Sequence, residues 1–473
     1  MLTLANPRIG ISYLPHQEVG VRWMLSQEAG PHQGGILGDD MGLGKTFQCI
    51  GLLKNAPRPL RTLIVCPPAL ISGWATELRA CDFQVAEMSG PASWTMGTKA
   101  EKEANKGKET VWLTTYPKVT LYHAYIKKEA FERIILDEGH AIRNGEATAR
   151  WTSCMAAAAA ASARWILSAT PIQNGKKDWR NLCKWLHVAA STEADDIMLR
   201  RTMADLRADI AALPPPPHFV QHELSIPTGG REGKLFRVLC DNAQSAFDSS
   251  SVSALAKLEL FMRIQQFLVH PQVYIDAMRN KFGSGYTRPD WSSGSAAADS
   301  ATKWTACMAE LAAAVADKVG TIVFCQFRQE MDMVCRAAAE MGASVFSVRG
   351  GTDAGAEVEG AKTAVAAGEA VVIVVQIVSG GAGLNLQFCR RILFLSQHWN
   401  PAVVHQAVGR AVRIGQSHVV DIHFFSIVDE VAKNLDKRMA ELHGCKIDAA
   451  RDICESLYEG FHVVEIEDEV DEV

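Results

Sequence analysis

The chain has 473 residues, of which 48% are hydrophobic and 21% are charged, and it carries a formal net charge of −5 at pH 7. Because one hydrophobic core rarely grows beyond ~250–300 residues, this length predicts two or three domains. The composition excludes a strongly basic nucleic-acid-binding protein. We see no apolar run of ~20 residues and no secretory signal, so we predict a soluble protein with no membrane partner.

Short apolar strand-like runs alternate with longer helical stretches along the chain, which is typical of parallel sheets flanked by helices. The first half contains predicted strands over 62–66, 110–115, 133–137 and 164–169. The second half contains predicted strands over 321–325, 344–348, 370–375, 391–396 and 419–425. We therefore predict an α/β fold with two similar lobes, each built on its own parallel sheet.

The sequence changes character between the two predicted sheets. Consecutive prolines in "LPPPP" predict an extended connection, and helical segments around 231–247 and 253–268 and a Gly/Ser-rich stretch near 283–302 follow. We predict four regions: an N-terminal lobe over 1–212 with a helical insertion near 175–212, a linker with a helical insertion over 213–302, a C-terminal lobe over 303–446, and a C-terminal helix with an acidic tail over 447–473.

Twelve cysteines are scattered between Cys49 and Cys454. None of them forms a CxxC pair, which argues against a zinc site of that kind and against a compact disulfide framework. We therefore expect the protein in a reducing, intracellular compartment.

The stretch "GGILGDDMGLGKTFQ" (34–48) is typical of a phosphate-binding loop that opens a helix, although Asp39 occupies the place of the first glycine in GxxxxGKT. Glycines let the backbone turn so that amide groups face phosphate oxygens. Lys45 would then contact the β- and γ-phosphates, and Thr46 would bind Mg²⁺. We expect ATP and Mg²⁺ as cofactors, bound by the loop residues Asp39, Met41, Gly42, Leu43, Gly44, Lys45 and Thr46.

Two carboxylates end the predicted strand in "RIILDEGH" (133–140). This position lies at the carboxyl end of a sheet, where α/β proteins bind their ligands. Asp137 can bind the metal, partly through water, and Glu138 can orient and polarise the attacking water. We therefore predict Lys45, Asp137 and Glu138 as catalytic residues.

Seven motifs follow one another along the chain: "GDDMGLGKT", "DEGH", "LSATPIQN" (167–174), "MLRRT" (198–202), "SGGAGLNL" (379–386), "WNP" (399–401) and "QAVGRAVRIGQ" (406–416). In this order they resemble the Swi/Snf-type ATPases of helicase superfamily two, over nearly the whole chain from about Leu14 to Lys446. The resemblance implies two RecA-like lobes with an ATP site in the cleft between them, and a minimal motor without accessory domains.

The resemblance also implies roles outside the nucleotide motifs. Gln17 matches the glutamine that reads adenine. Ser168 and Thr170 match the motif that couples the nucleotide state to the grip on DNA. The segment 62–74 and the segment "TTYP", which contains Thr114, match stretches that touch the DNA backbone.

Two later motifs belong to the same scheme. The glycines of "SGGAGLNL" permit close backbone approach, so we expect Gly381 to contact DNA and Gly383 to contact the nucleotide. Trp399 completes the group of DNA-contact and coupling residues. We interpret it as a buried anchor, because base stacking belongs to the recognition of single strands.

The segment "QAVGRAVRIGQ" predicts a helix that places Arg410 and Arg413 one turn apart. In the family these are the finger positions that reach the γ-phosphate from the opposite lobe, with Gln406 beside them. Such an arginine can contribute ~10³–10⁵ in rate. We therefore predict Arg410 and Arg413 as catalytic residues and Gln406 as a nucleotide-binding residue.

These expectations describe an ATP-dependent double-stranded DNA translocase that remodels protein–DNA complexes. Its main partner would be double-stranded DNA, held through sequence-independent backbone contacts. The resemblance implies DNA-bound proteins, such as histones or repair factors, as further partners of a monomeric motor. Its location would be the nucleus for a eukaryote or for a virus acting there, and the cytoplasm otherwise.

Two alternatives share parts of the pattern. A strand-separating helicase of superfamily two, acting on DNA or RNA, would carry every ATPase motif. A nucleotide-clamped DNA-binding scaffold would bind ATP without using the carboxylate of Glu138. Strand separation on addition of ATP distinguishes the first alternative, and full activity of Glu138→Gln would support the second.

Overall fold

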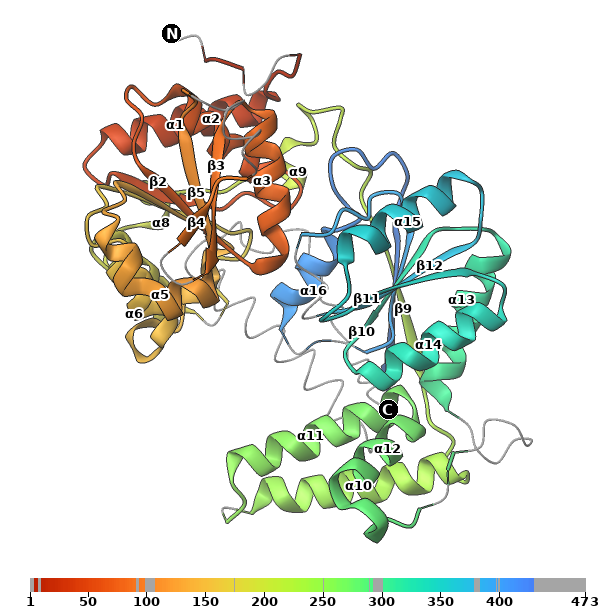
Figure 1. Cartoon of the computed structure of the whole chain (residues 1–473). Helices are drawn as coiled ribbons and strands as arrows, with labels where there is room; N and C mark the ends of the chain where they lie inside the picture. Colours follow the sequence, from red (N-terminus) through yellow and green to blue (C-terminus); the bar gives the residue numbers. More distant parts are fainter. Residues whose placement is uncertain are drawn as a thin grey trace, which may run out of the picture. The chain divides into compact units, whose positions relative to one another are not determined.

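The structure is a computed structural model that describes residues 4–428 apart from 7–9, 91–92, 98–106, 174, 250, 289, 292–300, 378–382, 397 and 399. These residues form two compact units that divide between Leu213 and Pro214. Each unit contains its own sheet, and helices flank both sheets (Figure 1). The prediction of an α/β fold with two parallel-sheet lobes is confirmed.

The first unit is built on an eight-stranded sheet with the order β4-β3-β5-β2-β6-β7-β1-β8. All its strand pairs are parallel except the edge pair of β3 and β4. The strands are β1 (Gly34–Leu37), β2 (Thr62–Cys66), β3 (Gln84–Gly90), β4 (Ser93–Thr95), β5 (Thr110–Thr115), β6 (Arg133–Asp137), β7 (Ala163–Leu167) and β8 (Met198–Leu199). Parallel strands place their carboxyl ends at one edge, where β1, β6 and β7 continue into the predicted motifs.

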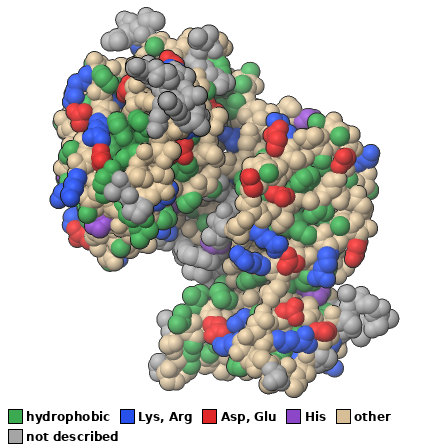
Figure 2. Space-filling model, in the orientation of Figure 1, with side chains coloured by type: hydrophobic (Ala, Val, Ile, Leu, Met, Phe, Trp, Pro, Cys, Tyr) green, Lys and Arg blue, Asp and Glu red, His purple; other side chains and the backbone are tan. Residues whose placement is uncertain are grey.

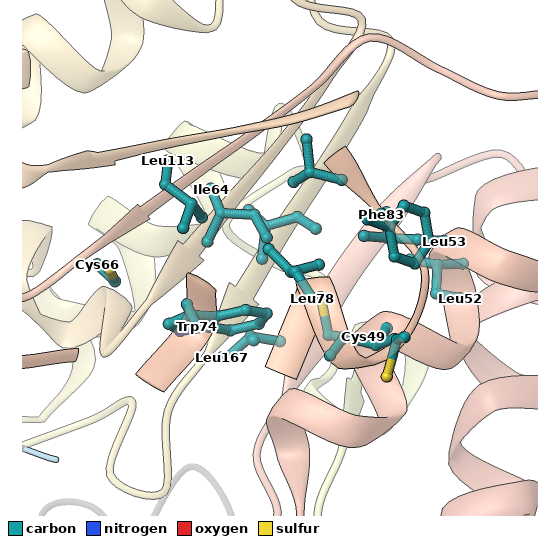
Figure 3. Packing of buried hydrophobic residues seen from close by; sticks show 14 of the residues in the cluster. Cys49, Leu52, Leu53, Ile64, Cys66, Trp74, Leu78, Phe83, Leu113 and Leu167 are labelled. Carbon is teal, nitrogen blue, oxygen red and sulfur yellow. The ribbon is translucent and has the colours of Figure 1, made fainter. Parts of the chain in front are cut away.

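Helices cover this sheet and form its hydrophobic core. They are α1 (Pro15–Ala29), α2 (Lys45–Asn55), α3 (Ile71–Ala80), α5 (Tyr116–Lys128), α6 (Ala149–Ala157), α7 (Lys176–Leu186), α8 (Ala194–Ile197) and α9 (Met203–Leu206). Figure 3 shows apolar side chains of α2 and α3, among them Leu52 and Leu78, packed with strand residues such as Ile64. Burying one such side chain contributes ~1.5–3 kcal/mol, so this packing fixes α2 and the loop before it.

The second unit is built on a six-stranded parallel sheet with the order β11-β12-β10-β13-β14-β9. The strands are β9 (His218–Leu224), β10 (Thr321–Cys325), β11 (Ser344–Val348), β12 (Val371–Gln376), β13 (Arg391–Phe394) and β14 (Asp421–Ile427). The helices beside it are α13 (Thr302–Ala316), α14 (Arg328–Glu340), α15 (Ala354–Ala366) and α16 (Pro401–Val408). The central strands β10 and β12 are almost wholly apolar, as expected of parallel strands covered on both faces.

A group of three helices in the second unit has a core of its own. It consists of α10 (Arg231–Asp248), α11 (Ala254–Val269) and α12 (Pro271–Phe282). Stacked Phe236 and Phe267 lie in this core. The side chain of Ser253 caps α11, and that of His270 caps α12, by accepting hydrogen bonds from backbone amides in the first turn.

Sequence and structure agree on the bounds of five strands, over 62–66, 110–115, 133–137, 321–325 and 344–348. Strand β9 differs, because 218–224 lies inside the predicted linker and yet pairs in parallel with β14 at the edge of the second sheet. Its sequence "HFVQHEL" carries polar residues at most positions, as an edge strand tolerates, so it lacks the apolar run of the central strands. The predicted C-terminal helix and acidic tail lie outside the described residues.

The described residues also bear on the expectations about cysteines and membrane-spanning segments. The described cysteines are free thiols, and all but Cys335 are buried. Across 4–428, with the gaps given above, no helix is both long enough and apolar enough to span a membrane.

Candidate nucleotide-binding and catalytic site

The loop from Gly38 to Thr46 connects β1 to α2 at the carboxyl edge of the first sheet. Gly44 caps α2 with a φ of 80°, a left-handed conformation that glycine adopts without strain, and a Cβ there would displace the side-chain amide of Gln17, whose Nε2 would lie 2.5 Å away. Nζ of Lys45 donates hydrogen bonds to the carbonyl oxygens of Asp39 (2.6 Å) and Asp40 (3.1 Å). The ammonium group therefore lies within the loop, where a phosphate would compete for it.

The ammonium group of Lys45 is buried among carboxylates. Burial lowers the pKa of its ammonium group, whereas the nearby carboxylates, with Glu138 first and Asp39, Asp40 and Asp137 after it, act in the opposite direction. These interactions place the two carboxylates that end β6 close to the lysine of the loop. That Lys45, Asp137 and Glu138 are catalytic residues stays a prediction.

The predicted adenine-reading residue lies against the same loop. Nε2 of Gln17 donates to the carbonyl oxygen of Leu43 at 3.3 Å, and Nε2 of His16 lies 2.9 Å from the same oxygen. The Leu43 side chain is fully buried in the core, so this residue offers only its backbone to a ligand. Gln17 is thus positioned by α1 at the edge of the phosphate-binding loop.

A buried ion pair between Asp39 and Arg201 fixes the phosphate-binding loop to the rest of the first unit. The carboxylate of Asp39 is completely buried and accepts two hydrogen bonds from Arg201, at 3.0 and 2.5 Å, and one from Nε2 of Gln48 at 2.9 Å. Arg201 also donates to Oε1 of Gln48 at 2.9 Å and to the carbonyl oxygen of His16. The Asp39 side chain is therefore directed into the protein, and only its backbone is available to a nucleotide.

A second ion pair, between Arg200 and Asp40, also holds the phosphate-binding loop. Arg200 donates to Oδ1 of Asp40 at 3.0 Å and to the carbonyl oxygens of Gly38 and Ala169. Oδ2 of Asp40 accepts the amide of Met203 at 3.1 Å. The motif "MLRRT" thus ties two successive loop carboxylates to β8, a role that its sequence alone did not indicate.

The Arg201 contact yields a stability prediction. Arg201→Ala would leave the Asp39 carboxylate buried without its cation, and losing one partner of a buried pair costs ~3–5 kcal/mol. We therefore expect the free energy of unfolding of the first unit to fall by about that amount in a denaturant titration. Arg22→Ala, which removes the partly exposed pair with Glu18 on α1, should cost only ~0.5 kcal/mol. Equal midpoints for the two variants would contradict this role of Arg201.

Both carboxylates predicted to be catalytic lie at the carboxyl end of β6, Asp137 as its last residue and Glu138 directly after it. Oδ2 of the buried Asp137 accepts a hydrogen bond from Nε1 of Trp74 at 2.7 Å, and Oδ1 accepts the amide of Glu138 at 3.0 Å. Burial and the charge of Glu138 raise the pKa of Asp137, and the bond from Trp74 opposes this shift. Each oxygen retains a lone pair, which fits the binding of Mg²⁺ through water.

The backbone turns sharply after the strand. Glu138 adopts φ 50° and ψ 47°, a left-handed conformation that is uncommon for residues other than glycine and that concentrates at functional sites. A Cβ on Gly139 would lie 2.6 Å from Ile166, so glycine is needed for the close passage over β7. This turn directs the carboxylate of Glu138 away from the strand axis.

Trp74 is a positioning residue that the sequence analysis placed in a DNA-contacting segment. Its side chain is 2% exposed, and its indole N–H holds Asp137. The indole N–H of a buried tryptophan needs a hydrogen-bond acceptor. The sequence could therefore indicate that Trp74 has an acceptor, but it could not identify Asp137 as that acceptor.

A pH prediction follows from this contact. Trp74→Phe removes a hydrogen bond to the ionised form of Asp137, so its pKa should rise further. Because we expect the ionised carboxylate to be the active form, the acidic limb of the ATPase pH profile should move to higher pH. A hydrogen bond to a charged group contributes ~1.5–3 kcal/mol, which corresponds to about 1–2 pH units. Steady-state phosphate release measured across the pH range gives this shift.

The matched control for this variant is Trp151→Phe. Trp151 is also buried in the first unit, but its indole donates to the carbonyl oxygen of Asn181 at 3.3 Å. Its pH profile should keep the parent midpoint. A Trp74→Phe profile that superimposes on that of Trp151→Phe would show that the indole does not tune Asp137.

A histidine links the catalytic turn to the next motif. Nδ1 of His140 lies 3.3 Å from Oε2 of Glu138 and 3.1 Å from Oγ of Ser168. Oγ of Ser168 accepts the amide of Thr170 at 3.2 Å, and Oγ1 of Thr170 accepts Nε2 of Gln173 at 3.3 Å. The predicted coupling residues Ser168 and Thr170 are therefore connected to Glu138 by short polar contacts.

The arginine segment of the second unit differs from its prediction. Within 406–416, α16 ends at Val408, and Arg410 and Arg413 lie in the turns that follow. Gly409 caps the helix, and glycine has the lowest helix propensity apart from proline. The expectation that the two arginines share one face of a helix was therefore wrong.

The turns that carry the arginines are nevertheless held in place. The carbonyl oxygen of Arg410 accepts the amide of Leu386 at 3.0 Å. The buried side chain of Gln416 donates to the carbonyl oxygens of Gln387 (2.7 Å) and Cys389 (2.9 Å). The end of "SGGAGLNL" thus packs against the arginine segment within the second unit.

The other residues predicted to bind the nucleotide or DNA differ in how exposed they are. Arg413 is partly buried, and burial lowers the pKa of its guanidinium group. Gln406 lies on α16 and is partly exposed, and Gly383 has a φ of 84°. Thr114 is 1% exposed and donates to Sδ of Met88 at 3.5 Å, which does not fit a DNA contact by its side chain. Gly381 and Trp399 lie outside the described residues.

Two protein-family models match the chain. The model of the SNF2-related domain matches residues 16–217, and the model of the helicase conserved C-terminal domain matches residues 302–415. The first match contains the phosphate-binding loop, the β6 carboxylates and the Ser168 motif. The second contains Gly383, Arg410 and Arg413.

Relatives from three kinds of organism align with most of the chain. The probable global transactivator of Orgyia pseudotsugata multicapsid polyhedrosis virus is 25% identical over 88% of this chain and 86% of its own length. The chromodomain-helicase-DNA-binding protein 1-like of Danio rerio is 25% identical over 86% of this chain, and the putative ATP-dependent helicase/translocase YwqA of Bacillus subtilis is 24% identical over 89%. The chain spans 41% of the fish protein and 47% of the bacterial one.

A solved structure, the Sulfolobus solfataricus SWI2/SNF2 ATPase core in complex with dsDNA, aligns at 20% identity. The alignment covers 94% of this chain and 95% of that one, with a TM-score of 0.39.

Proposed function

The chain belongs to the SNF2-related, DNA-dependent ATPases of helicase superfamily two, and we propose that it couples ATP hydrolysis to movement along double-stranded DNA. The observation that carries this proposal is the site on the first sheet, where Lys45 lies close to Asp137 and Glu138 and a histidine connects Glu138 to Ser168. This arrangement joins the groups for hydrolysis to a motif that can report the state of the nucleotide.

In our proposal, the loop after β1 binds the phosphates of ATP. The backbone amides and Lys45 would contact phosphate oxygens, and the N-terminus of α2 adds its partial positive charge. Asp137 and Thr46 would hold Mg²⁺, which neutralises phosphate charge when it is bound with the nucleotide. Gln17, which contacts the loop through Leu43, would contact the base.

Glu138 is the group that would orient and polarise the attacking water. Its backbone conformation directs the carboxylate out of the strand, and His140 lies within 3.3 Å of it. The contact from His140 to Ser168 supplies a physical route from the catalytic carboxylate to the coupling motif. A change at the γ-phosphate would then alter the position of Ser168 and Thr170.

We propose that the arginines of the second unit complete catalysis. Arg410 and Arg413 lie in a segment that backbone and glutamine hydrogen bonds fix to the region around Leu386. A guanidinium group that meets the γ-phosphate stabilises the charge that develops during transfer. Requiring groups from two units makes hydrolysis depend on the arrangement of the units, which is what a motor needs.

The proposed track is the phosphate backbone of double-stranded DNA. On the face drawn in Figure 2, Lys and Arg side chains are interspersed with Asp and Glu, without a large basic field. Contacts through backbone amides, hydroxyls and scattered cations suit a sequence-independent grip whose affinity falls as salt rises. We further propose that the protein acts as a monomeric motor and remodels DNA-bound proteins, such as histones or repair factors. It would do so in the compartment that holds the DNA.

The test compares phosphate release with duplex DNA, single-stranded DNA and RNA at equal nucleotide concentration. We expect duplex DNA to raise turnover most and RNA least, with the stimulation declining as salt increases. Lys45→Ala, which loses the phosphate contacts, gives the background rate. Greater stimulation by RNA would contradict the proposed track, and separation of a plain duplex on addition of ATP would favour a strand-separating helicase instead.

A further inference from the structure

Three potential metal ligands from three elements meet in the second unit, and none of them belongs to an ATPase motif of the sequence. His222 belongs to β9, His423 to β14 and Glu310 to α13. Nε2 of His222 lies 2.9 Å from Nδ1 of His423. The carboxylate oxygens of Glu310 lie 4.0 Å from the first nitrogen and 3.7 Å from the second.

The strand register brings these side chains to one face of the sheet. β9 and β14 run in parallel with His222 opposite Phe425, and His423 lies two residues before Phe425 on the same face. The ring of His222 stacks on Phe425 at 4.5 Å and on His423 at 5.2 Å between centroids. Phe425 shares its core with Leu311 of α13, which places the neighbouring Glu310 beside the histidines.

We propose that His222, His423 and Glu310 bind a divalent transition-metal ion of the zinc class. Imidazole nitrogens and a carboxylate are ligands that Zn²⁺ accepts at about 2.0–2.2 Å. In a tetrahedral site this distance separates neighbouring ligand atoms by about 3.3 Å. The two nitrogens, at 2.9 Å, are closer than this value. The Glu310 separations, 4.0 Å for one carboxylate oxygen and 3.7 Å for the other, are longer, and with one ligand atom from each residue the three atoms lie within 4.8 Å of one another. Small side-chain shifts would therefore complete the site.

A hydrogen bond between the two imidazoles explains only part of this geometry. One N–H···N bond would account for the 2.9 Å contact, but it leaves the Glu310 oxygens at 3.7 and 4.0 Å, beyond hydrogen-bond range. A neutral imidazole has the free lone pair that a metal needs.

The surroundings favour Zn²⁺ over Mg²⁺ and allow the ion to enter. Two imidazole ligands suit zinc, whereas Mg²⁺ prefers oxygen donors and retains its waters. The side chains of His222 and Glu310 are 21% and 32% exposed, so solvent reaches the cluster and can supply the remaining ligand.

A bound ion would connect three segments that are distant in the sequence. β9 begins directly after the prolines at 214–217, and its neighbour in the sheet is β14. The three ligands would join β9 to β14 and to α13. Because a ligand that binds only the folded state stabilises it, the thermal stability of the chain should rise with added Zn²⁺. This site goes beyond the proposed motor function and does not depend on it.

The experiment uses the full chain, freed of metal by a chelator and kept in excess Mg²⁺ so that the carboxylates of the ATP site are saturated. Calorimetric titration with Zn²⁺ should show one equivalent bound, together with a rise in melting temperature. Co²⁺ should give the visible absorption of a site with nitrogen and oxygen ligands, without the near-ultraviolet charge-transfer band of a thiolate.

Two variants and one matched control identify the ligands. His222→Ala and Glu310→Gln should each weaken Zn²⁺ binding by ~100-fold or more, since even the loss of an outer partner of a metal ligand costs ~10–100-fold. His218→Ala changes an exposed histidine on the same strand and should keep the parent affinity. Circular dichroism confirms that each variant is folded.

Three results would overturn the proposal. The first is a folded parent chain that binds no Zn²⁺. The second is equal Zn²⁺ affinity in His222→Ala and His218→Ala. The third is a thiolate band in the Co²⁺ spectrum, which would assign the ion to cysteines. The first result could come with a melting temperature that depends on pH through His222 and does not change with Zn²⁺. That combination would indicate a proton shared between the two histidines in place of a metal ion.

Discussion

Replacing Arg413 with alanine is expected to lower DNA-stimulated ATP turnover by ~10³–10⁵-fold, the contribution of an arginine that stabilises charge in phosphoryl transfer. Nucleotide affinity should change little, because the phosphate-binding loop, Lys45 and Gln17 all belong to the first unit. Single-turnover phosphate release gives the rate, and binding of a fluorescent ATP analogue gives the affinity.

The control for this prediction is Arg336→Ala in the same unit. Arg336 is exposed on α14, and its side chain donates to the carbonyl oxygen of Asp332 in its own helix, at 3.4 Å. Its turnover should match that of the parent. If Arg413→Ala loses affinity and rate in equal proportion, the residue binds the ground state and does not act on the transition state.

Glu138→Gln is expected to reduce ATP hydrolysis by ~10²–10⁴-fold, the usual contribution of a positioned general base. Glutamine keeps the size of the side chain and can still accept a hydrogen bond from His140, so ATP should bind and remain intact. This separates Glu138→Gln from Lys45→Ala, in which the phosphate contacts and therefore the affinity are lost. Phosphate release and equilibrium nucleotide binding measured on the same preparations show the difference.

Glu146→Gln is the matched control for the carboxylate. Glu146 lies in the same unit and pairs with Lys184 on the surface, where its side chain is 58% exposed. Its ATPase rate should equal that of the parent. Hydrolysis by Glu138→Gln at the rate of Glu146→Gln would mean that the carboxylate is idle, which would support a nucleotide-clamped scaffold.

The central strands and the groups at their carboxyl ends could be predicted from the sequence because both depend on local patterns. β2, β6 and β10 are runs of apolar residues whose length fits one strand, and parallel topology brings the segments after β1, β6 and β7 to one edge. Lys45, Asp137, Glu138 and Ser168 therefore fall together in the structure.

Pairings across long distances in the sequence were not predictable in the same way. The bond from Trp74 to Asp137 joins residues 63 positions apart, and the pair of Arg201 with Asp39 spans 162 positions. Nothing in the local pattern around either residue identifies its partner. These contacts depend on the order of the strands, which places α3 and β8 beside the edge that carries the candidate site.

The end of α16 shows how one residue can end a predicted helix. The spacing of Arg410 and Arg413 suits a helix, yet Gly409 lowers helix propensity where the backbone leaves the α16 geometry. Strand β9 shows the opposite effect, since a polar sequence becomes a strand by pairing with β14. A single residue of the local sequence decides the first case, and the tertiary pairing of two strands decides the second.

Displacement of a third strand from a DNA triplex tests the central claim most directly, because a motor that tracks along duplex DNA removes the third strand without separating the other two. The account predicts displacement that requires ATP hydrolysis, is absent with Glu138→Gln and leaves the underlying duplex paired. A triplex that stays intact while the protein hydrolyses ATP at its DNA-stimulated rate would contradict it.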